Sequence, residues 1–412
     1  MSSAGLFKFA VANRRFIAFG FLAASASSFG QTYFIGIFGP VFQAEFGLSH
    51  TIWGSIYLIG TLASAAMLPV SGKLIDHIPL RRYALWVCGL LMLACGLTTL
   101  VNGAITLIFS IFLLRHAGQG LMSHIAITTM ARYFSAGRGR AIAIATLGFS
   151  LGEALLPFLA VLAIASYGWR WTYGGVVLYL GLIVIPIFLL LLKDLGDRPP
   201  ADTAPMSRAE QKQIQQQRSW TRAEVLRDPR IYLLLPGLLA APIISTAMFF
   251  HHLTLAGAKG WSYAWITGSY LIYAVSTVIT ALIVGQTIDR LGAVRLVPFM
   301  LLPLISAMIV IAVFNNPFAV WLYMVLMGIN IGIAHTSVSA MWAEMYGVKH
   351  LGAIRSLATA VGVFGTALGP VTLGSLMDWG LPIEHVCLIF AGYSVIGTCL
   401  MVATFRHKIQ NS

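Results

Sequence analysis

Long apolar runs separated by short polar links make up most of the chain. Each run is long enough to cross roughly 30 Å of hydrocarbon as a helix that rises about 1.5 Å per residue. The first six runs begin near Phe16, His50, Tyr83, Ala104, Ala141 and Trp171. Six more begin near Ile231, Ser262, Val294, Pro317, Leu351 and Leu381. The pattern predicts an all-α membrane protein with twelve transmembrane helices.

A polar segment separates the sixth run from the seventh. It starts with three prolines and continues as a charged, glutamine-rich stretch, which predicts a flexible beginning followed by a polar surface helix. We therefore expect three parts: a six-helix bundle over 1–192, a cytoplasmic linker over 193–230 and a second six-helix bundle over 231–412.

Composition and charge agree with this architecture. Hydrophobic residues make up 58% of the chain, charged residues 9%, and the net charge is +13. With twelve spans, 23 of the 26 Lys and Arg residues fall on the side of the two termini, and the exceptions are Arg115, Arg170 and Lys259. By the positive-inside rule both termini are cytoplasmic, so the basic character requires no nucleic acid. We expect a multi-pass protein of a cell membrane, such as a bacterial inner membrane.

Motifs for enzyme chemistry and metal binding are missing from the sequence. The four cysteines lie inside apolar runs and form no CxxC pair, and the histidines form no HExxH. There is also no GxxxxGK[ST] loop for a nucleotide. The sequence therefore predicts neither an enzyme nor an ATP-driven pump, and no metal or cofactor. The apolar run 16–42 is too long for a signal-peptide core, so we interpret it as a retained first span.

The two halves share a register. An offset of 213 residues pairs special positions of one half with the same residue type in the other. The pairs are Gly72 with Gly285, Asp76 with Asp289, Arg82 with Arg295, Tyr133 with Tyr346, Gly139 with Gly352, Gly152 with Gly365 and Pro157 with Pro370. A shared register over so long a stretch indicates a duplicated six-helix unit.

Two loops carry a family resemblance. GKLIDHIPLRR (72–82) and its echo GQTIDRLGAVR (285–295) resemble the signature loop of the major facilitator superfamily. The resemblance implies two pseudo-symmetric six-helix bundles and a conformational latch at the cytoplasmic ends of the two halves. Carried over to this chain, the latch residues are Gly72, Asp76, Arg81, Arg82, Gly285, Asp289, Arg290 and Arg295. The alternative is that Asp76 and Asp289 cap their own loops.

A finer resemblance concerns one branch of the superfamily. Residues 128–157 and the end of the linker are similar to the monocarboxylate and oxalate/formate transporters. That branch commonly places an arginine in the eighth span, whereas residues 270–286 carry no charge here. The resemblance therefore does not extend to that arginine.

Arg115 interrupts the fourth apolar run in LLRHAGQG, residues 113–120. It lies roughly 16 Å into the span, close to the bilayer midplane. A charge at this depth costs at least ~2.5 to 3.5 kcal/mol, so Arg115 should face a polar cavity or a partner. Helical spacing places Gln119 on the same face. The stretch also resembles the fourth-span arginine motif of proton-coupled superfamily members, which implies a role in substrate and proton binding.

Glu153 is the acidic residue that lies well inside a span. Helix lengths place it within reach of Arg115 if both side chains extend. A pair of this kind could take up and release protons, so we assign proton coupling to Glu153 and Arg115. A static salt bridge between the fourth and fifth spans is the alternative interpretation.

Neutral polar residues recur at helical spacing in several spans. We expect the substrate-binding set to include Gln31, Tyr57, Tyr270, Tyr273, Thr277 and His335, together with Arg115 and Gln119. The stripes could instead bind helices to one another, and His335 could be a hydrogen-bonded packing residue.

The leading prediction is a monomeric secondary transporter in the lipid bilayer. It would move a small organic solute, an organic anion held by Arg115, by alternating access coupled to protons. Within the same class, the alternative is a proton-driven efflux antiporter for drugs or metabolites. In another class, the alternative is a receptor or scaffold that does not transport.

Overall fold

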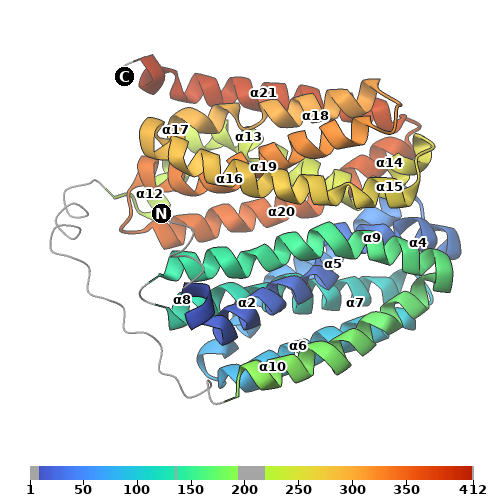
Figure 1. Ribbon diagram of the computed structural model, residues 1–412. Helices are drawn as coiled ribbons and strands as arrows, with labels where there is room; N and C mark the ends of the chain where they lie inside the picture. Colours follow the sequence, from blue (N-terminus) through green and yellow to red (C-terminus); the bar gives the residue numbers. More distant parts are fainter. Residues whose placement is uncertain (1–8, 135–136, 194–218, 411–412) are drawn as a thin grey trace. The chain divides into compact units, whose positions relative to one another are not determined.

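The computed structural model describes residues 9–134, 137–193 and 219–410, and this part of the chain is helical apart from short connections (Figure 1). Ten stretches of it are long and apolar enough to cross a membrane. One of these, Arg138–Leu191, is 54 residues long and turns at Gly168, so it holds two predicted spans. The first predicted span consists of several shorter helices. The predicted all-helical membrane fold is confirmed.

Backbone contacts divide the chain into two compact units. The first consists of Met1–Ala204 with Phe250–Leu253, and the second of Pro205–Phe249 with Thr254–Ser412. Each unit holds six of the predicted spans, apart from the four residues at the end of the seventh span that group with the first unit.

The first unit contains the helices of spans one to six. Its first span runs through α2 (Arg14–Ala26), η1 (Ser27–Gly30), α3 (Thr32–Ile35), η2 (Gly36–Phe38) and α4 (Gly39–Phe46). The second and third spans are α5 (His50–Ser71), extended by η3 (Gly72–Asp76), and α6 (Leu80–Thr99). The fourth span is α7 (Ala104–Leu114), η4 (Arg115–Met122) and α8 (Ser123–Tyr133). The fifth and sixth are α9 (Arg138–Tyr179), η5 (Leu180–Val184) and α10 (Ile185–Leu191).

The predicted linker reaches the described part of the second unit at residue 219, and its residues 194–218 lie outside the described residues. Thr221 and Glu224 form a capping box at the start of α12 (Arg222–Arg227). Spans seven to nine follow as α13 (Pro229–Phe250) with α14 (His252–Ala258), α15 (Tyr263–Gly268) with α16 (Tyr270–Leu291), and α17 (Ala293–Leu296), η6 (Val297–Phe299) and α18 (Leu302–Val313). The last three spans are α19 (Ala319–Tyr346), α20 (Leu351–Asp378) and α21 (Ile383–Gln410).

Helix boundaries repeat between the units in the register that the sequence predicts. The paired starts are His50 with Tyr263, Leu80 with Ala293 and Arg138 with Leu351, and the paired ends are Tyr133 with Tyr346. The two numbers of every pair differ by 213. The same offset therefore relates folded elements as well as residue types, as a duplicated six-helix unit requires.

Glycines bring equivalent span pairs into close contact in both units. In the first unit, a Cβ on Gly148 of α9 would lie 2.1 Å from the carbonyl oxygen of Phe21 on α2. In the second unit, a Cβ on Gly369 of α20 would lie 2.2 Å from the carbonyl oxygen of Ile243 on α13. Only hydrogen fits at these positions, and the first span thereby packs directly on the fifth, and the seventh on the eleventh.

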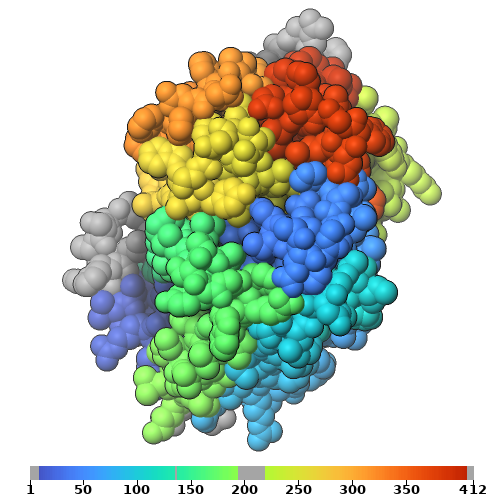
Figure 2. Space-filling model, turned by 90° about the vertical axis from the view of Figure 1, so that its right-hand side faces the viewer, coloured from blue at the N-terminus to red at the C-terminus, as the bar shows by residue number. Residues whose placement is uncertain are grey.

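An ion pair joins the first and sixth spans at one end of the first unit. Glu45 accepts from Arg170 at 2.7 Å and from the Trp169 indole at 2.6 Å. The end of α4, in blue, and the turn of α9, in green, lie side by side there (Figure 2). The hydrogen bond from Trp169 lowers the pKa of the Glu45 carboxyl below its usual value; partial burial opposes this effect and Arg170 reinforces it.

The second unit has a corresponding ion pair of reversed polarity. The Lys259 ammonium lies 3.2 Å from Glu384, and its side chain is only 1% exposed. It also donates to the Asn315 side chain at 2.6 Å. Lys259 and Glu384 each fall one position from the repeat equivalents of Glu45 and Arg170. Arg170 and Lys259, the basic residues predicted to lie at the outer side, therefore each have an acidic partner within their own unit.

Candidate functional site

The first span is broken in its middle. Gln31 has an extended backbone (φ −84°, ψ 154°) between the 3-10 turn η1 and the short helix α3. Just before the break, the Ser27 hydroxyl donates to the carbonyl of Ala24 at 2.7 Å, and such local bonds compete with the helical pattern. A break releases backbone carbonyls from the helix, and discontinuous spans of this kind are typical of ligand sites in transporters.

The fourth span contacts the break through a π-helical segment. Residues Arg115–Met122 form η4, in which the helix is wider than an α-helix. A Cβ on Gly30 would lie 2.1 Å from the carbonyl oxygen of Leu114, and a Cβ on Gly118 would lie 2.6 Å from the amide nitrogen of Gly30. These glycines allow the backbones of the two spans to touch, which brings the released carbonyls of the first span to Arg115.

Neutral oxygen atoms hold the Arg115 guanidinium. Nη1 donates to the Gly30 carbonyl at 3.1 Å and to the Thr32 hydroxyl at 3.5 Å, and Nε donates to the Thr61 hydroxyl at 3.2 Å. Cζ lies 5.0 Å from the centre of the Tyr57 ring, which provides a cation–π contact. The side chain is 1% exposed, so the predicted demand for polar partners is met inside the first unit.

The second terminal nitrogen of Arg115 is different. Nη2 is buried and has no hydrogen-bond partner among the described residues. Its N–H groups prefer a carboxylate or phosphate oxygen, with which arginine forms short charge-assisted hydrogen bonds. A buried donor without a partner is costly, and in a native protein it points to a strain reservoir or to a binding function.

Glu153 lies near the broken segment and does not pair with Arg115. It follows Gly152, on which a Cβ would lie 2.0 Å from the Ser28 hydroxyl oxygen. Tyr33 donates to the same hydroxyl at 2.8 Å, and Glu153 acts electrostatically on Tyr33. No described basic side chain forms an ion pair with Glu153. The expected pair is therefore not formed, because the break supplies Arg115 with backbone and hydroxyl acceptors.

The first unit brings together the other predicted residues of its half. The Tyr57 hydroxyl shares a short hydrogen bond with Thr32, beside Arg115. Gln31 follows Gly30 and donates to the Ser123 hydroxyl at 3.5 Å. The backbone of Gln119 also packs on Gly30, because a Cβ there would lie 2.7 Å from the Gln119 amide nitrogen. Arg115, Gln31, Tyr57 and Gln119 thus form one cluster around the broken first span.

The remaining predicted residues belong to the second unit. Tyr270 and Tyr273 are buried and both pack edge-on against the Phe249 ring, at 5.2 and 4.9 Å between centroids. Thr277 donates to the carbonyl of Tyr273 at 2.9 Å, within its own helix. His335 is on α19, is exposed, and takes part in none of these three contacts. Tyr270 and Tyr273 therefore share an aromatic cluster.

The two units differ at the position of the arginine. The repeat equivalent of Arg115 is Gly328, on which a Cβ would lie 2.6 Å from the carbonyl oxygen of Tyr273. The helices α16 and α19 are packed too tightly there for a long side chain. The guanidinium site is therefore specific to the first unit.

The first signature loop contains an ion pair that the sequence did not predict. Asp76 accepts from Arg132, at the end of the fourth span, at 3.1 Å. Arg132 also donates to the carbonyl of Ile75 at 3.2 Å. Gly72 is buried at the base of the loop, whereas Arg81 and Arg82 are exposed. The bond to Arg132 holds Asp76 against the end of the fourth span.

The second signature loop is organised by a different residue. Glu344, at the end of the tenth span, accepts from the backbone amides of Ala293 and Val294 at 2.8 and 3.2 Å. It therefore caps the start of the ninth span, where a negative charge is favourable. The predicted latch residues of this copy are exposed or half-buried: Gly285, Asp289, Arg290 and Arg295.

Sequence reasoning missed three contributors to these sites: Gly30, Arg132 and Glu344. Thr61 lies at helical spacing from Tyr57 in the polar stripe of the second span. Arg132 and Glu344 are charged residues in the last turn of the fourth and tenth spans, one position apart in the repeat register, and this coincidence could have been noticed. For Gly30 the sequence gives no comparable signal, because the break in the first span is visible only in the fold.

The fold and the site define a multi-pass helical membrane transporter with a broken first span, and comparison with known proteins gives its family. The family model of the Major Facilitator Superfamily matches residues 20–370 and again 265–410. The chain belongs to the major facilitator superfamily. It is accordingly a membrane transporter and not an enzyme.

Solved structures show the same fold at low sequence identity. A bacterial homolog of the human lysosomal transporter Spinster, in an inward-facing and occupied conformation, superposes with a TM-score of 0.73 at 14% identity, covering 95% of this chain and 96% of that one. The nucleoside transporter NupG gives a TM-score of 0.71 at 16% identity and covers 95% and 98%. None of the curated protein sequences matches the chain significantly.

Proposed function

We propose that the protein is a proton-coupled secondary transporter for a small organic anion, bound through Arg115. The observation that carries the proposal is the buried guanidinium, which neutral oxygens position and whose Nη2 has no partner among the described residues. An anionic oxygen at Nη2 would supply both the missing hydrogen bond and the missing counter-charge.

The broken first span offers a physical route between anion and proton. Arg115 contacts its residues Gly30 and Thr32, while Gly152, next to Glu153, packs on Ser28, whose hydroxyl accepts from Tyr33. Movement of this short segment on anion binding would therefore change the surroundings of Glu153. We propose that Glu153 carries the proton and that the segment 28–33 couples it to Arg115.

Alternating access completes the proposal. The two units would rock about the solute site, with Tyr270, Tyr273, Thr277 and His335 contributed by the second unit and the two signature loops acting as the latch. The direction of transport is an outcome of the test, since inward-directed and outward-directed vesicles distinguish uptake from efflux.

Binding and transport assays test the proposal. The purified protein is screened by thermal shift against small carboxylates, amino acids, sugars and cationic drugs, and hits are followed in proteoliposomes under a pH gradient. We expect carboxylates to stabilise the wild type but not Arg115→Gln, and Glu153→Gln to exchange substrate while losing accumulation driven by pH. Stabilisation by cationic drugs alone, undiminished in Arg115→Gln, would reject the anion site. Undiminished pH-driven accumulation by Glu153→Gln would remove that residue from the coupling.

A further inference from the structure

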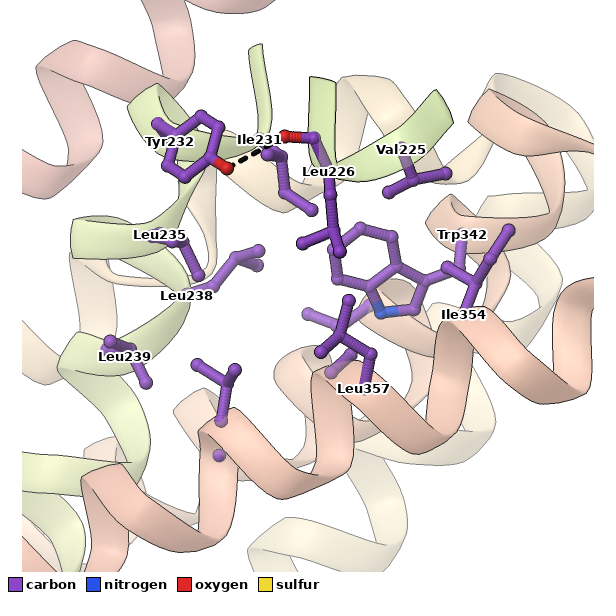
Figure 3. A pocket seen from close by; sticks show the side chains of 14 residues that line it. Val225, Leu226, Ile231, Tyr232, Leu235, Leu238, Leu239, Trp342, Ile354 and Leu357 are labelled. Atoms are coloured by element: carbon purple, nitrogen blue, oxygen red, sulfur yellow. Dashed lines mark hydrogen bonds between the residues drawn. The ribbon is translucent and has the colours of Figure 1, made fainter. Parts of the chain in front are cut away.

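A cavity of about 210 Å³ lies within the second unit, between α12, the first turns of α13, the end of α19 and the first turns of α20 (Figure 3). Leu235, Leu238 and Leu239 of α13 line one wall, at spacings that place them on one helical face. Ile354 and Leu357 of α20 and Trp342 of α19 line the opposite wall. Ala358 and Gly362 of α20 are also in the lining, and their small size leaves the gap between the walls.

Polar bonds outside the cavity fix its walls. Asp228, just before α13, accepts from the Tyr346 hydroxyl of α19 at 3.0 Å. Trp220, just before α12, donates its amide to the carbonyl of Tyr346 at 2.9 Å. These bonds hold α12 and α13 against the end of α19. The gap is therefore part of the fold of this unit and does not depend on the arrangement of the two units.

Hydrocarbon is the chemistry that the cavity accepts. Its lining is apolar, and the hydroxyl of Tyr232 already donates to the carbonyl of Leu226 at 2.7 Å. Water would find too few hydrogen-bond partners there, because stable internal water needs two to four. An unfilled apolar cavity costs stability in proportion to its volume. An apolar chain would remove that cost and gain the burial of its own surface.

The position of the cavity in the membrane suits a lipid acyl chain. Its deepest labelled lining residue on α13, Leu239, lies ten residues after Pro229, or roughly 15 Å from the helix start. This depth corresponds to one leaflet of a hydrocarbon core about 30 Å thick. Leu226 and Tyr232 line the cavity and are 42% and 55% exposed, so the cavity opens beside them. Tyrosine is enriched at this level, between headgroups and chains.

Basic residues surround the same end of the unit. Arg227 directly follows Leu226, and Arg355 directly follows Ile354; both arginines are exposed and neither forms an ion pair among the described residues. Arg355 donates to the hydroxyl of Ser339, beside the lining residue Val338, at 3.2 Å. Each basic group close to the surface of an anionic membrane contributes about 1 kcal/mol of attraction.

We propose that this cavity binds one acyl chain of an anionic phospholipid of the adjoining leaflet, with the phosphate headgroup held by Arg227 and Arg355. The cavity shares no lining residue with the proposed solute site. The proposal does not depend on the chemistry of the transported solute.

Photo-crosslinking with lipids tests the site. The full-length protein is placed in nanodiscs that contain a phosphatidylglycerol carrying a diazirine in its acyl chain, and labelled peptides are identified by mass spectrometry. Ala358→Trp fills the cavity, and Ala360→Trp, at an exposed position of the same helix, is the matched control. We expect labelling of 231–239 and 354–362 in the wild type and in Ala360→Trp. In Ala358→Trp it should fall about tenfold, which corresponds to losing the burial of roughly two methylene groups.

A second arm tests the headgroup. Phosphatidylcholine with the same chains should label these peptides less than phosphatidylglycerol, and each of Arg227→Gln and Arg355→Gln should reduce the preference for the anionic lipid by about fivefold. These substitutions lie at exposed positions, so the fold tolerates them. Labelling that is equal in Ala358→Trp and Ala360→Trp, or that is absent from both peptides, would overturn the proposal. Equal labelling by both lipids, unchanged in the arginine variants, would overturn the anionic headgroup.

Discussion

The guanidinium of Arg115 donates to the backbone carbonyl of Gly30 over 3.1 Å, which connects the π-helical segment of the fourth span to the break in the first. The break in the first span leaves the Gly30 carbonyl without its helical hydrogen bond, and Arg115 of the π-helical segment donates to that carbonyl. The bond explains how a membrane-embedded arginine is kept without a carboxylate. It also leaves Nη2 free to bind an anion.

Replacing Arg115 with methionine separates function from stability. The change removes a buried charge that has no acidic partner and keeps a chain of similar length, so we expect the free energy of unfolding to change by about 1 kcal/mol or less. Solute transport should fall roughly 10- to 100-fold, because a charge-assisted hydrogen bond to the solute is lost. Thermal unfolding in detergent and proteoliposome uptake measure the two effects. A loss of several kcal/mol with parallel loss of transport would show that Arg115 is structural.

Gly30→Ala should damage the contact between the first and fourth spans. The new Cβ would lie 2.1 Å from the backbone oxygen of Leu114, which cannot rotate away. We expect a loss of about 3 kcal/mol or more in stability, at the upper end for overpacking. Gly89→Ala on α6 is the control, because a Cβ there meets nothing within 4 Å. The thermal unfolding midpoints of the two variants should differ clearly. Similar midpoints would mean that the first and fourth spans can move apart at Gly30 without loss of stability.

Glu45 should make the first unit less stable in acid. Its pKa is lowered in the folded protein, so its contribution is fully present above the unfolded value of about 4.3 and is lost as the pH falls through the folded pKa. The side chain is 36% exposed, and the gain is therefore limited to ~1 kcal/mol. The stability difference between wild type and Glu45→Gln should be constant above about pH 5 and should shrink as the pH falls below about 4.3. A difference that does not shrink below about pH 4.3 would contradict the assignment.

The ion pair between Lys259 and Glu384 in the second unit should contribute more to stability than the pair between Glu45 and Arg170. Glu384→Gln leaves the Lys259 ammonium, which is 1% exposed, without its counter-charge. We expect a loss of about 2 to 3 kcal/mol, the lower part of the range for buried pairs because Glu384 is 30% exposed. The double variant Lys259→Met/Glu384→Gln should recover part of this loss in chemical or thermal unfolding. No recovery would mean that the ammonium is already satisfied by Asn315.

Asp76→Asn should change transport while leaving stability nearly unchanged, and it therefore tests the proposed latch role of Asp76. The pair with Arg132 is largely exposed, at 62% and 31%, so its loss should change the unfolding free energy by no more than ~1 kcal/mol. Transport should nevertheless fall roughly tenfold if Asp76 biases the conformational equilibrium. Initial uptake rates, compared with those of Arg132→Gln, measure this. Unchanged rates in both variants would leave Asp76 as a capping residue of its own loop.

The internal repeat shows which features of the fold could be predicted from the sequence. Glycine, aspartate, arginine and proline recur at one offset, and the folded helices begin at the same offset because each copy must bury the same pattern. The register pairs Gly328 with Arg115, but it could not show that the second unit has a glycine at this position for a steric reason. That reason is the contact of Gly328 with the Tyr273 carbonyl, which depends on the packing of α16 on α19.

The sequence by itself determined the membrane class, the spans, the duplicated unit and the need of Arg115 for polar partners inside the protein. These follow from the transfer of side chains and peptide groups between water and hydrocarbon, which depends on local composition and segment length. Only the tertiary structure decided the partners: Gly30 and Thr61 for Arg115, Arg132 for Asp76, and a separate environment for Glu153. Partners depend on where helices far apart in the sequence come into contact and where a helix breaks, and hydropathy carries neither kind of information.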